Sequence, residues 1–303
     1  PLAFIILGVS TFISLFQTIL SSFLTAFQKF LPQTVLGFIN AIFTITISIV
    51  LIKIGLGATG AVLGQIIAGV LVSILTLYQI KDSIFPPLKR SSLVIPTLKN
   101  FTFYSFIYSL GTMALMSTDI LVVRVLFDTH TSGLYSSLSI LGRMILFGLS
   151  PLIGLVFPIS SLRFSQKRNP QNIFLKLGSG MLFLGFVGAT IFTLFPSLII
   201  KILSGAQYLE VANLLGLFAF TMVAFAISQF ILSYLMATTR EKANLILLAA
   251  TIIQPAIIYV FGTSLTNVVY INFTIHILLL ISLVIYLLSP QISALKFIHE
   301  EEA

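Results

Sequence analysis

The stretch "ANLILLAATIIQPAIIYVFGTSLTNVVYINFTIHILLLISLVIYLLSPQISAL", residues 243–295, contains no lysine, arginine, aspartate or glutamate. As a single α-helix it would be about 80 Å long, whereas the hydrocarbon core of a bilayer is about 30 Å thick. It must therefore fold back on itself, and "FGTSLTN" (261–267) supplies residues that favour a turn. Its apolar residues do not alternate as they would in a membrane β-barrel. The stretch predicts two transmembrane helices.

The whole chain has the composition of a membrane protein. Of its 303 residues 58% are hydrophobic and 8% are charged, and the mean hydropathy is +1.13, whereas soluble domains carry about 25% charged residues. The absence of cysteine excludes disulfides and thiolate metal sites, and the three histidines have no metal-ligand spacing. The net charge of +8 is spread over short loops. It therefore favours phospholipid headgroups as partners and argues against nucleic acid.

The fold class that we expect is all-α, a polytopic membrane bundle of about nine helices. Each predicted span is close to the roughly 20 apolar residues that a crossing needs, and the spans cover residues 1–23, 34–52, 58–80, 99–123, 133–158, 174–200, 211–236, 243–261 and 266–288. The chain begins at Pro1 directly in apolar sequence, without the basic segment of a signal peptide. We therefore expect that an earlier part of the protein is missing.

The lysines and arginines predict the orientation. If residue 1 lies outside, 12 of the 16 fall in inside loops, three fall in outside loops and one lies within a span. Positive residues are enriched in cytoplasmic loops, so this bias supports both nine spans and a cytoplasmic C-terminus in the plasma (inner) membrane.

The longest inside loop suggests two groups of helices. Residues 81–98, "KDSIFPPLKRSSLVIPTL", contain three prolines and several basic residues, and we interpret them as a hinge or interfacial linker, with an ordinary solvated loop as the alternative. The expected organisation is three helices in 1–80, the linker in 81–98, six helices in 99–288 and a cytoplasmic tail in 289–303.

The acidic residues do not indicate an enzyme. No two of the acidic residues before the C-terminal tail form a local pair, and no Asp-x-Asp, His-Glu-x-x-His or phosphate-binding glycine loop is present in the sequence. The sequence favours a protein without enzymatic activity, metal or cofactor.

Two charged residues lie well inside predicted spans, away from their cytoplasmic ends, where an unpaired charge is costly. Asp119 lies about one and a half turns below the outer end of its span, and Arg143 lies about 15 Å into the next one. They can form a buried ion pair that joins two antiparallel helices. Alternatively they line a water-filled cavity, where Arg143 attracts an anionic group such as phosphate and Asp119 orients it or binds a coupling H⁺ or Na⁺.

Uncharged polar residues extend the list of cavity candidates. Serine and threonine commonly join membrane helices, but amide and imidazole side chains are harder to place in lipid. With Asp119 and Arg143, the substrate-binding candidates are therefore Gln17, Asn40, Gln65, Gln229, Asn272 and His276. Kinks or helix ends are expected at Pro151, Pro158, Pro196 and Pro255.

Two stretches resemble bacterial polysaccharide flippases of the multidrug/oligosaccharidyl-lipid/polysaccharide exporter superfamily. In "STDILVVRVLFDTHTSGLYSSLSILGRMILFGLSPLIGLVFPISS" (117–161), the matching residues are Asp119 near the end of a span, Gly133 and Tyr135 at the start of the next and Pro158 near its inner end. In "SSFLTAFQKFLPQTVLGFI" (21–39), the match is Gln28-Lys29.

The resemblance implies a two-lobe transporter with an incomplete first lobe, because members of this family have 12 to 14 spans in two lobes around a central cavity. It also implies alternating-access flipping of a polyprenyl-pyrophosphate-linked oligosaccharide for cell-surface polysaccharide synthesis, beside membrane glycosyltransferases and a polymerase. A multidrug exporter of the same fold, or a membrane enzyme of glycan assembly, are the alternatives.

Overall fold

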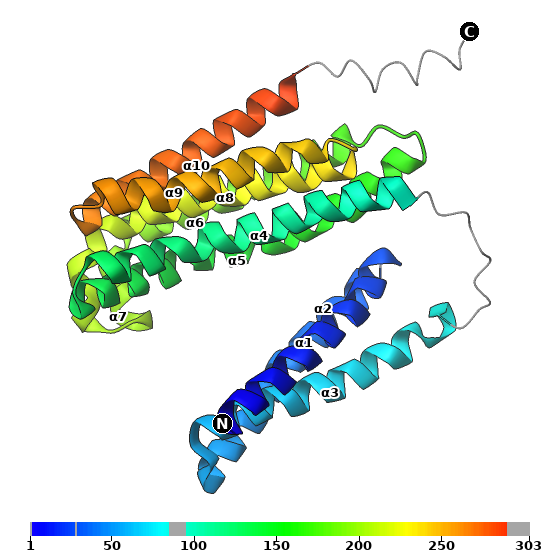
Figure 1. Ribbon diagram of the computed structural model, residues 1–303, viewed down its shortest axis with the longest axis horizontal. Helices are drawn as coiled ribbons and strands as arrows, with labels where there is room; N and C mark the ends of the chain where they lie inside the picture. Colours follow the sequence, from blue (N-terminus) through cyan, green and yellow to red (C-terminus); the bar gives the residue numbers. More distant parts are fainter. Residues whose placement is uncertain (1, 28, 85–94, 290–303) are drawn as a thin grey trace. The chain divides into compact units, whose positions relative to one another are not determined.

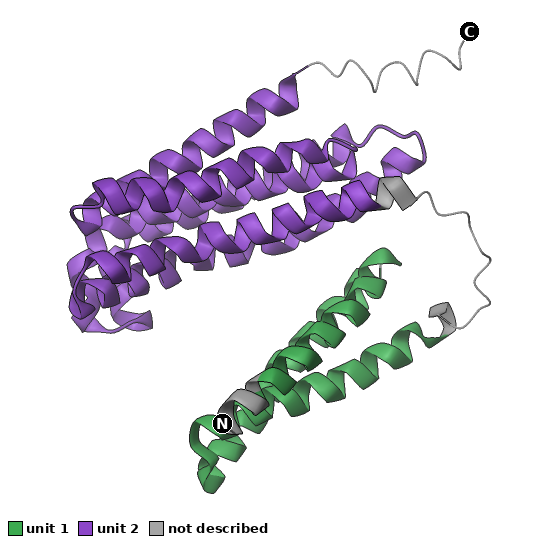
Figure 2. Ribbon diagram, in the orientation of Figure 1, with its two compact units in different colours: residues 1–93 green, residues 94–303 purple. Residues whose placement is uncertain are grey.

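The computed structural model describes residues 2–27, 29–84 and 95–289, and every element in these ranges is a helix. The chain divides into two compact units, residues 1–93 and 94–303 (Figures 1 and 2). Eight helical stretches are long and apolar enough to cross a membrane. One of them, Phe30–Lys81, contains two helices joined by a sharp turn, so the described chain has the nine spans that the sequence predicts.

Unit 1 consists of three long helices, α1 (Leu2–Ala26), α2 (Phe30–Leu51) and α3 (Gly57–Ile84). A short π-helical turn, η1 (Ile52–Leu56), joins α2 to α3, and the chain reverses there at Gly55, whose φ of 100° is accessible mainly to glycine. Helices α1 and α2 both pack on α3. Close approach of α2 and α3 depends on Gly64, because a Cβ there would lie 2.3 Å from the Ser48 hydroxyl oxygen.

Unit 2 contains six long helices and three short ones. In chain order they are α4 (Ile95–Leu126), α5 (Thr129–Ser165), α6 (Gln171–Leu194), α7 (Pro196–Leu203), η2 (Ala206–Val211), α8 (Ala212–Ala237), η3 (Glu241–Ala243), α9 (Asn244–Phe261) and α10 (Leu265–Leu288). The central helix is α8, which is buried along most of its length and packs against α5, α6 and α10, while α4 packs mainly against α9. This arrangement brings α4, α5, α9 and α10 together around the candidate site (Figure 1).

The structure corrects several predicted boundaries. The expected span 174–200 ends at Leu194, and Pro196 begins the separate helix α7, because proline lacks an N–H and disfavours helical backbone in the residue before it. The span expected to start at Gly133 begins earlier, since α5 starts at Thr129.

The prolines within the membrane behave in two ways. Pro196 begins a helix, as expected of a residue that punctuates the chain. Pro151 and Pro158 lie inside α5 and Pro255 lies inside α9, so they do not end these helices. The turn expected at 261–267 is present between α9 and α10, where the Ser264 side chain accepts a hydrogen bond from the Asn267 N–H at 3.2 Å.

The predicted linker 81–98 is shortened by helices from both ends, since α3 continues to Ile84 and α4 starts at Ile95. Its remaining residues, 85–94, and the predicted tail from residue 290 lie outside the described residues.

Candidate functional site

Asp119 of α4 and Arg143 of α5 form an ion pair inside unit 2. The Arg143 Nη2 lies 3.3 Å from Asp119 Oδ1, and the two side chains are 14% and 4% exposed, respectively. The same Nη2 also donates to the backbone carbonyl of Met116. The sequence left two alternatives open for these residues, a buried ion pair or the lining of a water-filled cavity, and the structure shows the ion pair. A role of either residue in substrate binding stays a prediction.

The antiparallel arrangement of α4 and α5 explains how these two residues meet. Asp119 lies about 10 Å from the end of α4, whereas Arg143 lies about 21 Å from the start of α5. Side chains on an α-helix lean toward its N-terminus, so Arg143 leans toward the α4–α5 turn and Asp119 leans away from it. The long arginine side chain closes the remaining difference in depth.

Four more polar residues extend the ion pair into a chain of hydrogen bonds, and the peptide bond between Thr118 and Asp119 closes this chain into a ring. Tyr135 donates its hydroxyl to Asp119 Oδ2 at 2.8 Å and accepts from Asn272 Nδ2 at 2.6 Å. Asn272 Oδ1 in turn accepts from Gln254 Nε2 at 2.6 Å, and Gln254 Oε1 accepts from the Thr118 hydroxyl at 3.2 Å.

This ring, comprising Thr118, Asp119, Tyr135, Gln254 and Asn272, with Arg143 attached, joins α4, α5, α9 and α10. All of its members except Thr118 are almost fully buried. Buried polar groups without partners are costly, so a closed set of hydrogen bonds stabilises one arrangement of the four helices. The Arg143 Nε is the exception, because it is buried without a hydrogen-bond partner.

The ring contains one carboxylate, that of Asp119, whose oxygens accept hydrogen bonds from Tyr135 and Arg143. Carboxylate, amide and hydroxyl oxygens are ligands for hard cations such as Na⁺, and a carboxylate also binds H⁺. Among the described residues, no group of three or more His, Cys, Asp or Glu side chains is placed to hold a metal ion. Oxygen ligands of this kind suit a proton or a hard monovalent ion better than a soft transition metal.

His276 lies beside the ring on α10. Its Nδ1 is 2.8 Å from the carbonyl of Asn272, and its ring packs edge-on against Phe225 of α8 at 5.0 Å. The Nε2 is buried without a partner. Gln229 of α8 is also nearly buried with its Nε2 unpartnered, and it makes no hydrogen bond to the ring.

The remaining candidates belong to unit 1. Gln17 of α1 is partly buried near Gly69 of α3, Asn40 of α2 has a buried Oδ1 without a hydrogen-bond partner, and Gln65 of α3 is exposed. None of these three contacts another candidate in unit 1 through a hydrogen bond. Within unit 2 the structure thus brings together Asp119, Arg143 and Asn272, places His276 next to them and leaves Gln229 without a hydrogen bond to them. The part of the three unit 1 candidates in a site stays a prediction.

Sequence reasoning missed three members of the ring. Tyr135 carried the resemblance to the flippases but was not proposed as a site residue. Gln254 was not among the proposed site residues, although an amide in an uncharged run of 53 residues was a usable signal. Thr118 gave no signal, because a threonine next to an aspartate is common at helix interfaces.

Comparison with known proteins assigns the family. The model of a family described as "Polysaccharide biosynthesis protein" matches residues 2–213, which is more than half of the chain. The chain belongs to this family. Its sequence matches none of the curated proteins with which it was compared.

Solved structures confirm the fold of this polysaccharide biosynthesis protein. The crystal structure of a MATE P26A mutant matches with a TM-score of 0.79 at 12% identity, covering 93% of this chain and 68% of that one. A MATE in the bent conformation matches with a TM-score of 0.76 at 11% identity and coverage of 93% and 67%. The inward-facing conformation of a multidrug resistance MATE family transporter of the MOP superfamily matches with a TM-score of 0.67 at 12% identity. The match covers 93% of this chain and 70% of that one.

These structures confirm the predicted fold class, and the family match agrees with the predicted resemblance to proteins of polysaccharide synthesis. The chain spans about two thirds of the length of the matched structures, and it is a multi-pass membrane protein with the MATE fold.

Proposed function

We propose that the protein moves a polyprenyl-pyrophosphate-linked oligosaccharide across the plasma membrane for the synthesis of a cell-surface polysaccharide. The observation that carries this proposal is the match of residues 2–213 to a polysaccharide biosynthesis family in a chain with a transporter fold.

The positive-inside bias supports a cytoplasmic C-terminus. In this orientation the protein receives its substrate from glycosyltransferases on the cytoplasmic face and delivers it to a polymerase on the outer face. Alternating access requires two arrangements of the helices.

Asp119 is the group that we assign to coupling with H⁺ or Na⁺. Its carboxylate faces Arg143 and Tyr135 of α5, the neutral amides Asn272 of α10 and Gln254 of α9 complete the ring, and His276 lies one turn from Asn272. Binding of a cation at Asp119 weakens its attraction for Arg143 and so loosens the contact between α4 and α5. This connects ion binding to helix movement.

The experiment is complementation of polysaccharide export in cells that lack their own flippase, with the full-length protein. We expect export by the wild type, and accumulation of lipid-linked oligosaccharide on the cytoplasmic leaflet with Arg143→Ala at an equal amount of protein in the membrane. Full export by Arg143→Ala would contradict the role of this residue in transport.

The double variant Asp119→Asn/Arg143→Met separates a transport role from a purely structural one. It removes both charges and so avoids a lone buried charge. If the pair acts only as a structural clamp, a folded double variant exports normally; if Asp119 couples transport to an ion, export stays defective and no longer depends on the H⁺ or Na⁺ gradient.

Multidrug export is the second candidate, because one matched structure is described as a multidrug resistance MATE transporter. Efflux of cationic dyes by cells that make the protein, without any effect on polysaccharide export, would favour this function over oligosaccharide flipping.

A further inference from the structure

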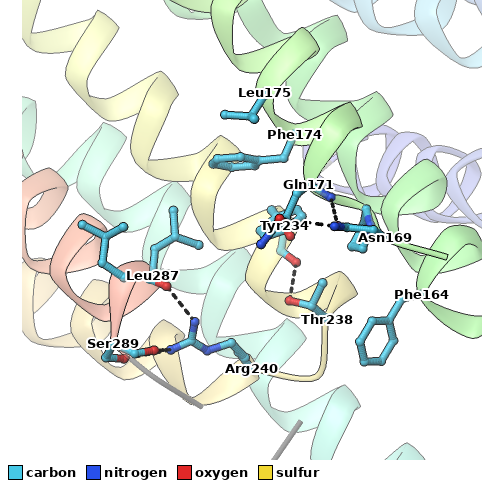
Figure 3. A pocket seen from close by; sticks show the side chains of 12 residues that line it. Phe164, Asn169, Gln171, Phe174, Leu175, Tyr234, Thr238, Arg240, Leu287 and Ser289 are labelled. Carbon is cyan, nitrogen blue, oxygen red and sulfur yellow. Dashed lines mark hydrogen bonds between the residues drawn. The ribbon is translucent and has the colours of Figure 1, made fainter. Parts of the chain in front are cut away.

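A cavity of about 500 Å³ opens at one end of unit 2, away from the polar ring (Figure 3). The loop between α5 and α6, the start of α6, the end of α8 and the end of α10 surround it. Phe174 and Leu175 of α6 and Tyr234 of α8 form apolar walls, and Arg240 lies at the opposite side beside Leu287. In the orientation favoured by the positive residues, this end of the unit faces the cytoplasm.

The cavity continues into an apolar groove of about 210 Å³ between α6 and α8. Phe174 and Leu175 line both spaces, and Gly178, Ile227 and Phe230 continue the groove along the two helices. The groove has almost no polar surface. A cavity with a cationic mouth and an apolar groove that runs along transmembrane helices has the shape of a lipid: a headgroup at one end and an acyl chain at the other.

Arg240 provides the cationic group. Its Nη atoms donate to the carbonyls of Leu287 at 3.0 Å and Tyr286 at 2.5 Å and to the Ser289 hydroxyl at 2.9 Å. These contacts hold the guanidinium at the cavity wall, and its plane lies over the Tyr286 ring at 4.7 Å. A guanidinium has five N–H donors, and the Nε–H takes part in none of these bonds, so the group keeps a donor for an anion.

The surrounding sequence is strongly basic. The last turn of α5, the two connections at this end and the first turns of α6 contain six cationic residues and one carboxylate, namely Arg163, Lys167, Arg168, Lys176, Arg240, Lys242 and Glu241. Among the described residues, none that lines the cavity is acidic. Basic pockets between helices on the cytoplasmic side of membrane proteins bind anionic lipid headgroups, so the charge at this end is complementary to a phosphodiester.

We propose that this cavity and groove bind an anionic phospholipid of the inner leaflet, with its phosphate near Arg240 and one acyl chain between α6 and α8. The site is separate from the Asp119 ring and independent of what the protein transports. The apolar groove distinguishes a lipid from free phosphate, because an inorganic ion gains nothing from the Phe174–Phe230 walls, whose rings are 5.2 Å apart. A bound lipid would tie α6 to the ends of α8 and α10.

The test measures binding of phosphatidylglycerol to the purified full-length protein in neutral detergent by native mass spectrometry. Phosphatidylcholine, inorganic phosphate and a polyprenyl phosphate are the competing ligands. Gly178→Leu should fill the groove, since a Cβ at this position lies 3.4 Å from Phe230 and the longer side chain extends into the acyl-chain space. Gly180→Leu on the same helix is the matched control, because no atom lies within 4 Å of its Cβ.

We expect the wild type to retain phosphatidylglycerol in preference to phosphatidylcholine. Gly178→Leu should weaken this binding about tenfold, the effect of losing a few buried methylene contacts, whereas Gly180→Leu should leave it unchanged. Arg240→Gln should remove the preference for the anionic headgroup, and Lys201→Gln on α7, at the other end of the unit, should not.

Three results would overturn the proposal. One is equal retention of the two phospholipids by the wild type. Another is an equal effect of the two glycine substitutions. The third is displacement of phosphatidylglycerol by inorganic phosphate or by the polyprenyl phosphate at lower concentration than by phosphatidylglycerol itself, which would assign the site to a free anion or to a transported lipid.

Discussion

Two pairs of charged residues in unit 2 can be compared. One aspartate and one arginine lie within the membrane-spanning region, and another aspartate and another arginine lie at its edges. The interior pair and the edge pair bind different partners. Inside, Asp119 and Arg143 bind each other, with Tyr135 as a further partner. At the edges, Asp128 accepts hydrogen bonds from N–H groups at the start of α5, and Arg240 donates to carbonyls at the end of α10.

The difference follows from the free-energy cost of a charged side chain, which is smaller at the end of a helix than within the hydrocarbon region of the membrane. At the ends of helices, unpaired backbone groups and water are both available, so a single charge can be accommodated by a helix end. Within the hydrocarbon region neither is available, and a charge needs an opposite charge or must be neutralised. The two sets should therefore respond very differently to loss of one partner.

The largest effect is expected when Asp119 is replaced by asparagine. Arginine cannot lose its proton in a protein, so Arg143 would remain charged in a buried site without its carboxylate. Breaking one side of a buried pair costs about 3–5 kcal/mol, and we expect Asp119→Asn to lower the free energy of unfolding by this amount. Reversible unfolding with sodium dodecyl sulfate measures the change. A loss comparable to that of an edge substitution would show that water reaches the pair.

Replacing Arg143 should cost less than replacing Asp119, because the remaining carboxylate can take up a proton and become neutral. We expect Arg143→Met to lie between the wild type and Asp119→Asn, and the double variant Asp119→Asn/Arg143→Met to be more stable than Asp119→Asn alone. A double-mutant cycle on the same unfolding measurement gives the coupling energy. Additive losses would contradict a direct ion pair.

Tyr135→Phe tests the neutral part of the ring. The substitution keeps the aromatic packing against Phe218, whose ring centre is 6.0 Å away, but leaves Asp119 Oδ2 and Asn272 Nδ2 without this partner. Two buried groups then lack a hydrogen bond, and we expect a loss of about 1–3 kcal/mol. Tyr108→Phe is a suitable control, since it removes one hydroxyl contact, with Ser233 at 3.2 Å. An equal loss in both variants would indicate that the ring has no special role.

The sequence predicts the fold of this protein well and its site only in part. Apolar runs, turn residues and basic loops are enough to predict the helices, because bilayer thickness and the positive-inside bias act on sequence directly. The same reasoning placed two charges on adjacent antiparallel helices. It failed where partners come from distant segments: Tyr135 meets Asn272 and Thr118 meets Gln254 only through packing of α4, α5, α9 and α10, which hydropathy does not encode.

The candidates in unit 1 show the other limit of this reasoning. Gln65 was selected because an amide is costly in lipid, yet its side chain is exposed on α3. An amide on a membrane helix can face lipid headgroups, a partner helix or a cavity, and sequence alone does not distinguish these surroundings. The residues of the ring differ from Gln65, because the structure shows which side chain each of them binds through a hydrogen bond.

Arg240→Gln should have a smaller effect on stability than any change within the ring. The guanidinium binds carbonyls at the end of α10, and water can replace it there. We expect a loss of about 0.5–1.5 kcal/mol in the free energy of unfolding. Arg240→Lys should recover less than half of this loss, because lysine cannot bind Leu287, Tyr286 and Ser289 with a planar fork. A loss of stability as large as that of Asp119→Asn would show that Arg240 behaves like a buried charge, as Asp119 and Arg143 do.

The smallest effect is expected at Asp128, which is exposed at the start of α5. Hydrogen bonds from the side chain and the backbone N–H of Thr131, and then from the N–H of His130, lower the pKa of the Asp128 carboxyl below its usual 3.8. A group whose pKa is lowered by folding stabilises the protein above its unfolded pKa and loses this contribution as pH falls through the folded value. Asparagine also caps helices but does not titrate, so Asp128→Asn should match the wild type at neutral pH and lack this pH dependence. The two proteins should therefore melt at the same temperature at neutral pH, and the wild type should become less stable than the variant as pH falls below about 3.8. A difference that is constant with pH would mean that the Asp128 charge adds nothing to the cap, and that even at the edge of the membrane the hydrogen bonds alone hold the start of α5.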